Sequence, residues 1–351
     1  MTDNNQKKQR AVVICPGRGT YNKDELGYFH RYHADKMEIL QTIDQHRSSK
    51  GQVTVAELDQ QAHYSMRLHT AGENASSLIY ACSAGDFQAI ALEQYEIVAV
   101  TGNSMGWYIA LAMAGALNPE HAINLINTMG SMMTGGLIGG QLIYPITNSD
   151  WQINHSLVGK IEQWLEQVNC LPEAQVYTSI KLGGYIVLGG NKAGLQAMMG
   201  LLPPIDDRYP MNLFNHAAFH TPLMNEIVVK AQQQLPPSLF EKPQLPLIDG
   251  QGKIWQPYSA DLIQLYQYTL GTQVNCSYDY SKAIEVAVKE FAPDKLIILG
   301  PGATLGGATA QALIAHQWQG MTCKQDFITR QQQDPVVLAM GMAEQRALVV
   351  N

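Results

Sequence analysis

The sequence predicts an α/β protein in which a parallel sheet is covered by helices. Three segments support this prediction, because each contains a short apolar strand followed by a Gly-rich turn. The strands are expected at residues 11–15, 97–101 and 296–299. Strands that alternate with turns and helices in this way are typical of a parallel sheet with helices on its faces.

Each of the three strands ends in a turn with its own sequence. The first strand ends at Pro16-Gly17-Arg18-Gly19, and the second runs into Gly102-Asn103-Ser104-Met105-Gly106. An apolar helical pattern then covers residues 107–117, and Asn118-Pro119 is expected to stop it. The third strand ends at Gly300-Pro301-Gly302, before an Ala-rich helical stretch.

The middle of the chain follows a different order. Strand, helix, strand, strand, helix and strand are expected at residues 141–146, 157–168, 175–181, 185–188, 193–202 and 211–214. Leu182-Gly183-Gly184 is a plausible hairpin turn between the two central strands. This β-α-β-β-α-β order is the ferredoxin-like pattern. We therefore expect a ferredoxin-like subdomain at residues 139–204, inserted into a large α/β domain of residues 11–138 and 205–351, with a flexible tail at residues 1–10.

Composition excludes several classes of protein. The chain is 46% hydrophobic and 15% charged, which argues against a disordered protein. Its 23 Lys and Arg against 30 Asp and Glu give a net charge of -7, which disfavours nucleic acid and anionic membranes as partners. Five scattered cysteines, with no C-x-x-C pair, indicate neither a disulfide framework nor a metal site. No signal peptide and no apolar run of the ~20 residues that a membrane span needs is seen, so a cytoplasmic location is expected.

Gly102 to Gly106 form a G-x-S-x-G sequence between a predicted strand and a predicted helix. This setting is that of a nucleophile elbow, in which a sharp turn exposes the serine above the sheet, and it indicates an α/β-hydrolase-like domain. The following helix aims backbone N–H groups toward Ser104, where they stabilise an oxyanion. The alternative is a tight strand-to-helix turn with a capping serine.

A serine nucleophile needs a base, and His220 is the favoured candidate. Thr221 and Pro222 follow it as a helix N-cap and a first helical residue, so His220 is expected at the mouth of a helix. The alternative is a loop histidine satisfied by the backbone. His216 is the nearest competitor and is expected to be structural.

Taken together, these segments resemble the malonyl-CoA:acyl carrier protein transacylase family, whose domain also occurs in fatty acid and polyketide synthases. Residues 15–20 look like the family's N-terminal P-G-Q-G-S loop, and residues 102–106 look like its G-H-S-x-G elbow. Residues 219–224 look like the segment with the catalytic histidine, and residues 300–302 look like the late G-P-G turn. The ordered match covers nearly the whole chain and includes the inserted subdomain.

The resemblance implies an acyltransferase with a ping-pong mechanism. Ser104 would be the nucleophile and His220 the base, while the backbone N–H groups of Met105 and Arg18 would hold the oxyanion. In this family a main-chain carbonyl orients the histidine, but residues 268–278 align ambiguously and leave that carbonyl unassigned. No permanently bound cofactor or metal is implied, since acyl-CoA and a phosphopantetheinyl acyl carrier protein are the substrates. A carrier protein of this kind is acidic, so its docking would need a basic surface on this chain. The residues available for such a surface are Arg67, Lys181, Lys192 and Arg208.

Three residues of the expected acyl pocket depart from the family's pattern. Met129 stands where malonyl-specific members carry an arginine that binds the free carboxylate. Asn103 replaces the histidine beside the serine, and Trp107 replaces the usual acidic residue after the elbow. An unpaired carboxylate in an apolar site is heavily penalised. The sequence therefore predicts transfer of an uncharged acyl group, such as acetyl or a longer chain.

Other readings remain open. An acyl-thioester hydrolase that clears carrier proteins, an ordinary malonyl-CoA:ACP transacylase and a non-catalytic partner that docks a carrier protein all fit the same motifs. Arg18, which replaces the family's glutamine, either brings a charge near the thioester or faces solvent. If its side chain reached the acyl pocket and paired with a carboxylate, the argument against malonyl would be weaker.

Overall fold

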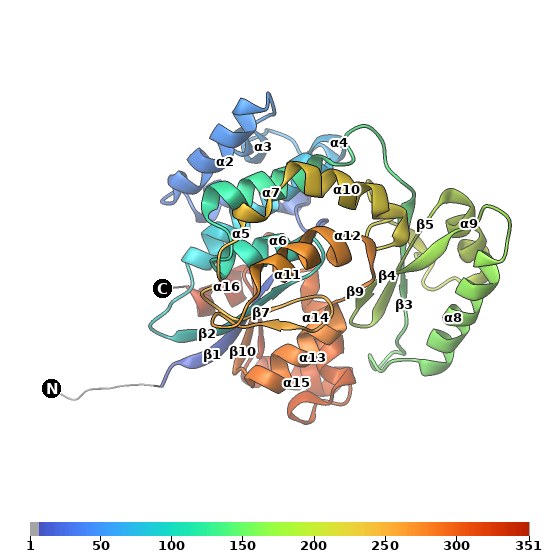
Figure 1. Ribbon diagram of the computed structural model, residues 1–351. Coiled ribbons are helices and arrows are strands. Elements are labelled where there is room, and N and C mark those ends of the chain that lie inside the picture. Colours follow the sequence, from blue (N-terminus) through green and yellow to red (C-terminus); the bar gives the residue numbers. More distant parts are fainter. Residues whose placement is uncertain (1–6, 351) are drawn as a thin grey trace.

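Two sheets organise the chain in the computed structural model, which describes residues 7–350 (Figure 1). The larger sheet has the order β11-β10-β1-β2-β7-β8. All its neighbours are parallel except the last pair. Its strands are β1 (Gln9–Cys15), β2 (Tyr95–Gly102), β7 (Leu247–Ile248), β8 (Ile254–Trp255), β10 (Lys295–Ile298) and β11 (Val337–Ala339). The predicted parallel sheet is confirmed, and its central strand β1 is buried from Ala11 onward.

The first strand begins inside the predicted tail. Gln9 and Arg10 belong to β1 because they pair with Tyr95 and Glu96 of β2. The backbone N–H of Arg10 also donates to a carboxylate oxygen of Asp294 at 2.8 Å. The predicted tail of residues 1–10 is therefore wrong for Gln9 and Arg10, and its residues 1–6 lie outside the described part of the chain.

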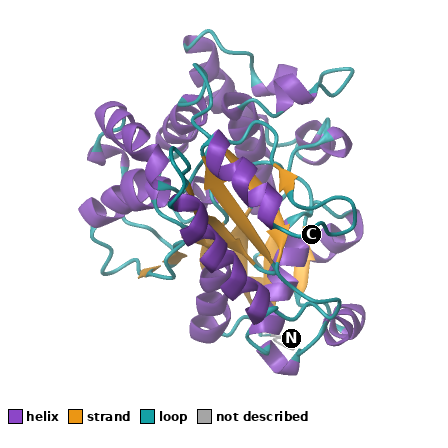
Figure 2. Ribbon diagram, turned by 90° about the vertical axis from the view of Figure 1, so that its right-hand side faces the viewer, coloured by secondary structure: helices purple, strands orange, loops and turns teal. Residues whose placement is uncertain are grey.

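Helices cover both faces of the larger sheet (Figure 2). In Figure 1, α6 and α7 lie above the strands, and α13 and α15 lie below them. The helices of the large domain are α1 (Tyr28–Tyr32), α2 (Met37–Ser49), α3 (Val55–Asp59), α4 (Met66–His69), α5 (Gly72–Gln88), α6 (Gly106–Met113), α7 (Pro119–Ser131), α10 (Asn225–Gln234), α11 (Leu262–Gln267), α12 (Gln273–Asn275), α13 (Tyr280–Phe291), α14 (Leu305–Ala315), α15 (Lys324–Gln333) and α16 (Ala343–Val349). Short 3₁₀ helices occur at η1 (Lys23–Glu25), η2 (Pro222–Met224), η3 (Pro237–Leu239) and η5 (Trp318–Gly320), and η4 (Tyr268–Thr272) is a π-helix. None of the helices among residues 7–350 combines the length and hydropathy that crossing a bilayer requires.

The helix after the elbow ends earlier than predicted. Helix α6 stops at Met113, and Gly115 follows with a φ of 73°. Asn118 and Pro119, expected to stop this helix, instead begin α7. The Asn118 side chain accepts a hydrogen bond from the backbone N–H of His121 at 2.9 Å, and Pro119 takes the first helical position, where its missing N–H costs nothing.

The second sheet holds the predicted insertion. Strands β3 (Gly140–Pro145), β4 (Val176–Leu182), β5 (Tyr185–Gly190) and β6 (Met211–Asn212) alternate with α8 (His155–Asn169) and α9 (Lys192–Leu201). Their order, β6-β3-β5-β4, with antiparallel neighbours, is the ferredoxin-like arrangement. This sheet lies to the right in Figure 1.

The second sheet extends beyond the predicted boundary at residue 204. Strand β6 pairs with β3, and β9 (Tyr278–Asp279) adds to the far edge, parallel to β4. The predicted boundary left out β6, although a strand was expected at residues 211–214. Strand β9 was not expected, because it is only two residues long and follows β4 by nearly a hundred residues of sequence. The pairing of β9 with β4 also attaches the inserted subdomain to the large-domain segment that precedes β9. Residues of that segment belong to the candidate site described below.

Candidate active site

Ser104 lies in a strained turn between β2 and α6. Its φ of 56° is in the left-handed region, which costs a residue with a Cβ about 1–3 kcal/mol. Gly102 and Gly106 make the turn possible: a Cβ at Gly102 would overlap with the backbone of Gly106, and one at Gly106 would overlap with the carbonyl oxygen of Cys15. The geometry is that of a nucleophile elbow, as the G-x-S-x-G pattern predicts.

Gly106→Ala is expected to destabilise the protein by at least about 1–3 kcal/mol, because the new methyl group has no space beside the rigid backbone of β1. Gly159→Ala in α8 is the matched control. Nothing lies within 4 Å of a Cβ built there, so alanine should stabilise this helix by about 0.5–1 kcal/mol. Urea unfolding of both variants measures the difference, and equal stabilities would contradict the expected overlap.

His220 contacts Ser104 directly. The Ser104 Oγ and the His220 Nε2 are 2.7 Å apart, and His220 Nδ1 is 2.6 Å from the carbonyl oxygen of Gln273. A carbonyl oxygen only accepts hydrogen bonds, so Nδ1 carries the proton and Nε2 is free to accept the Ser104 hydroxyl proton. The three groups thus have the hydrogen-bond arrangement that activation of a serine by a histidine requires.

The surroundings of His220 keep it neutral. Burial lowers the pKa of its imidazole from 6.5 to about 4, although the hydrogen bond to Gln273 opposes this shift. Thr221 precedes the short helix η2, as predicted, but its hydroxyl donates to the Ala218 carbonyl at 2.6 Å instead of capping the helix. His216, the competing candidate, is 2.9 Å from the Gln141 side-chain oxygen through Nδ1.

The low pKa of His220 predicts that Ser104 reacts at a nearly constant rate until the pH approaches 4. Only the neutral imidazole accepts the serine proton, and with a pKa of about 4 it stays neutral well below 6.5. The rate should therefore fall only as the pH decreases through about 4. Single-turnover acylation of Ser104, with circular dichroism to verify folding, measures the profile, and a midpoint near that of an ordinary histidine would contradict it.

Two backbone N–H groups beside Ser104 are available for an oxyanion. Within residues 7–350, the N–H groups of Met105 and Arg18 donate to no protein acceptor. Met105 lies at the start of α6, where the helix dipole also favours negative charge, and Arg18 lies in the loop after β1. Both groups are therefore available for the predicted role as oxyanion donors.

A small cavity of about 60 Å³ adjoins Ser104. Its wall is mainly apolar and includes Met129 of α7, one of the three residues expected in the acyl pocket. The remaining lining residues come from the end of α7 and from six other segments: Arg18, Ser76, Met105, Tyr108, Gly130, Met132, Phe219, His220, Ile227, Gln273 and Val274.

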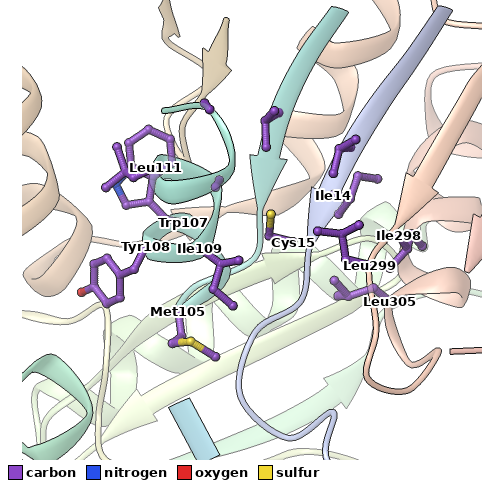
Figure 3. Close-up of a cluster of buried hydrophobic side chains, with 14 of the residues drawn as sticks. Ile14, Cys15, Met105, Trp107, Tyr108, Ile109, Leu111, Ile298, Leu299 and Leu305 are labelled. Atoms are coloured by element: carbon purple, nitrogen blue, oxygen red, sulfur yellow. The ribbon is translucent and has the colours of Figure 1, made fainter. Parts of the chain in front are cut away.

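Trp107 was expected in the acyl pocket but lies elsewhere. Its side chain is fully buried, and its indole N–H donates to the Thr269 hydroxyl at 3.0 Å. The next residue, Tyr108, reaches the cavity instead, because consecutive helical residues point in different directions (Figure 3). Asn103 also lies outside this cavity and lines the larger cleft described below.

Arg18 lines the small cavity. Its Nη2 donates to the carbonyl oxygens of Thr70 and Asn215, at 3.0 and 2.9 Å. Its Nε has no hydrogen-bond partner, and no ion pair of Arg18 occurs within residues 7–350. Burial lowers the pKa of its guanidinium to about 10, so it remains charged at neutral pH. A cation without a counter-ion therefore lies within the same cavity as Ser104 and Met129.

A larger cleft of about 630 Å³ reaches Ser104 from another side. It runs between the loop after β1, the second sheet and the start of α14, and Asn103 and Arg208 are among its lining residues. Ser104, Arg18 and Phe219 line both this cleft and the small cavity. No cluster of three or more His, Cys, Asp or Glu side chains that could hold a metal ion occurs in the described part of the chain.

Solved structures share this fold. The malonyl-CoA:ACP transacylase of Synechocystis sp. PCC 6803 has a TM-score of 0.74 and 17% identity, covering 97% of this chain and 100% of that one. A malonyl-transacylase in complex with its type II PKS acyl-carrier protein has a TM-score of 0.73 and 19% identity, covering 97% and 99%. The acyltransferase domain from the second module of the salinomycin polyketide synthase has a TM-score of 0.67 and 18% identity, covering 87% and 66%. No family model and no curated protein matches the sequence. The structural likeness confirms the predicted fold class and the resemblance stated above.

Proposed function

We propose that this protein, which has the fold of malonyl-CoA:ACP transacylases, transfers an acyl group from acyl-CoA to the thiol of an acyl carrier protein. The hydrogen bonds that link Ser104, His220 and the Gln273 carbonyl carry the proposal. They support Ser104 as the nucleophile, His220 as a neutral base and the Gln273 carbonyl as the orienting acceptor, and Ser104 lines both the small cavity and the larger cleft. Neither substrate is a permanently bound cofactor.

The geometry supports a two-step mechanism. Ser104 Oγ attacks the thioester carbonyl while its proton passes to His220 Nε2, and the N–H groups of Met105 and Arg18 stabilise the oxyanion. The C–S bond then breaks, and His220 protonates the departing thiolate of coenzyme A. In the second step His220 deprotonates the carrier-protein thiol, which attacks the Ser104 ester and regenerates the free hydroxyl.

The larger cleft suits the phosphopantetheine arm of either substrate. It leads to Ser104 and includes Arg208, whose guanidinium lies 5.3 Å from the centre of the Tyr209 ring. Lys181, another residue expected to help docking, is 3.4 Å from Asp279, so its charge is partly neutralised. A related fold binds a carrier protein, since one solved neighbour is a complex with an acyl-carrier protein.

The acyl group that the cavity supports best carries a carboxylate. The sequence predicted an uncharged group from Met129, and the cavity adds Arg18 to the same wall. A buried cation without a counter-ion is costly, and a carboxylate would offset that cost through a charge-assisted hydrogen bond to the guanidinium. Arg18 would thus replace, from the N-terminal loop, the arginine that the resembled family carries at the position of Met129.

The size of the cavity supports a short acyl group. Its 60 Å³ hold about four to six water-sized spheres, which is room for malonyl or acetyl and not for a long chain. An uncharged short group such as acetyl is the second candidate, and the apolar contacts of Met129, Met132 and Val274 favour it.

Intact-protein mass spectrometry after incubation with malonyl-CoA, acetyl-CoA and a long-chain acyl-CoA tests the proposal. A stable malonyl adduct that a holo-carrier protein then removes and retains is the expected result. An acetyl adduct without a malonyl adduct would favour the second candidate. Release of free acid without carrier acylation would identify a hydrolase, and no adduct with any donor would contradict acyl transfer.

A further inference from the structure

Gln273 contacts both members of the reactive pair through different atoms. Its backbone carbonyl accepts the His220 Nδ1 proton, while its side-chain Nε2 donates to the backbone carbonyl of Ser104 at 3.0 Å. The residue is only 2% exposed, so neither contact competes with bulk water. One residue therefore joins the backbone of the nucleophile to the ring of the base.

The elbow helix holds Gln273 in turn. The Tyr108 hydroxyl donates to the Gln273 side-chain oxygen at 2.7 Å, which leaves the amide N–H₂ directed at Ser104. One residue earlier on α6, Trp107 donates to Thr269 within the π-helix η4. The two aromatic side chains leave α6 in different directions, as Figure 3 shows, and each binds a different part of the segment before and at Gln273.

The contacts of Gln273 matter because Ser104 and His220 are both held in uncommon backbone conformations. Ser104 and His220 have φ values of 56° and 57°, and such strained residues persist only where their surroundings fix them. The orienting carbonyl also follows a π-helix, a rare turn that tends to occur at functional sites. Contacts from side chains must therefore supply part of the alignment that regular backbone structure does not.

We propose that the Gln273 side chain, fixed by Tyr108, is a positioning group for the reaction of Ser104. It keeps the serine backbone and the histidine ring at a set separation, so that Oγ and Nε2 stay within hydrogen-bond distance. The inference rests on the proposed function only for the identity of the substrates. It concerns how Ser104 is activated as a nucleophile.

The test measures Ser104 activation with a fluorophosphonate, a probe that requires no acyl donor. In the labelling step an O–P bond forms at Ser104, the P–F bond breaks, fluoride leaves with the bonding electrons and the serine proton passes to His220. Saturation kinetics separate the affinity for the probe, KI, from the maximal labelling rate, kinact. The variants are Gln273→Met, which preserves volume and the backbone carbonyl, and Tyr108→Phe, which removes one hydroxyl.

Gln273→Met is expected to lower kinact by about 10- to 100-fold with KI unchanged, as for a small displacement of a reacting group. Tyr108→Phe should lower kinact about fivefold, the factor that corresponds to one neutral hydrogen bond. Tyr280→Phe is the matched control, because its hydroxyl makes a buried 2.6 Å contact with Thr309 away from Ser104, and it should leave kinact unchanged.

The proposal would be overturned if Tyr108→Phe and Gln273→Met both keep the wild-type kinact. It would also be overturned if their only defect is weaker probe binding, seen in KI, or if Tyr280→Phe lowers kinact to the same extent. If Gln273→Met does not fold, Tyr108→Phe decides alone. Efficient fluorophosphonate labelling without any acyl-CoA adduct would refute the proposed function and leave this inference intact.

Discussion

Ser104→Ala is expected to abolish the covalent acyl adduct, and His220→Ala is expected to slow its formation by about 100- to 10,000-fold. Without Oγ no bond to the acyl carbon can form. Without the imidazole, the serine must lose its proton to water, although the oxyanion donors and the binding cavity remain. Rapid-quench mass spectrometry of the acyl-enzyme measures both effects.

Exposed residues of the same types provide the controls. Ser259→Ala and His155→Ala alter side chains on the surface, and both should acylate at the wild-type rate. An adduct of undiminished yield in Ser104→Ala would place the nucleophile elsewhere. A rate for His220→Ala within a few-fold of wild type would show that the 2.7 Å contact between Oγ and Nε2 has no catalytic consequence.

Arg18→Met is expected to invert the preference of the protein between malonyl-CoA and acetyl-CoA. The loss of the charge-assisted hydrogen bond should lower kcat/KM for malonyl-CoA by about 10- to 100-fold. Acetyl-CoA should react as well as before or better, because methionine extends the apolar wall formed by Met129 and Met132. The backbone N–H of residue 18 is retained, so a change in selectivity cannot be attributed to the oxyanion donor.

Two further variants sharpen this comparison. Arg18→Lys keeps the charge without the planar fork and should retain only part of the malonyl preference. Arg31→Met, on the surface, removes an arginine of similar size and should change neither substrate. If Arg18→Met lowers kcat/KM equally for both donors, its side chain acts on the common thioester and not on a carboxylate, and the uncharged acyl group predicted from Met129 becomes the better proposal.

The local features of this protein were predictable because each rests on a few neighbouring residues. Short apolar runs ended by Gly-rich turns predicted β1, β2 and β10, and the ferredoxin-like order was predicted from alternating strand and helix patterns. The contact between Ser104 and His220 was predicted only through the resemblance of ordered motifs, since 115 residues separate them in the sequence. Asn118-Pro119 misled the prediction because the same pair is suited both to stopping one helix and to starting the next.

Other features of the site depended on packing between distant segments. The carbonyl of Gln273 is a backbone group, so no residue type in the sequence marks its role. The π-helix before it also shifts the helical positions that a regular spacing would predict. Trp107 and Tyr108 are adjacent, so only the placement of α6 against residues 268–275 decided which ring reaches the cavity. By itself, the sequence determined the elbow, the choice of fold and the absence of an arginine at position 129. The tertiary structure alone decided that Arg18 enters the same cavity, because the direction of a long side chain from a loop depends on acceptors such as Thr70 and Asn215 that only folding brings near.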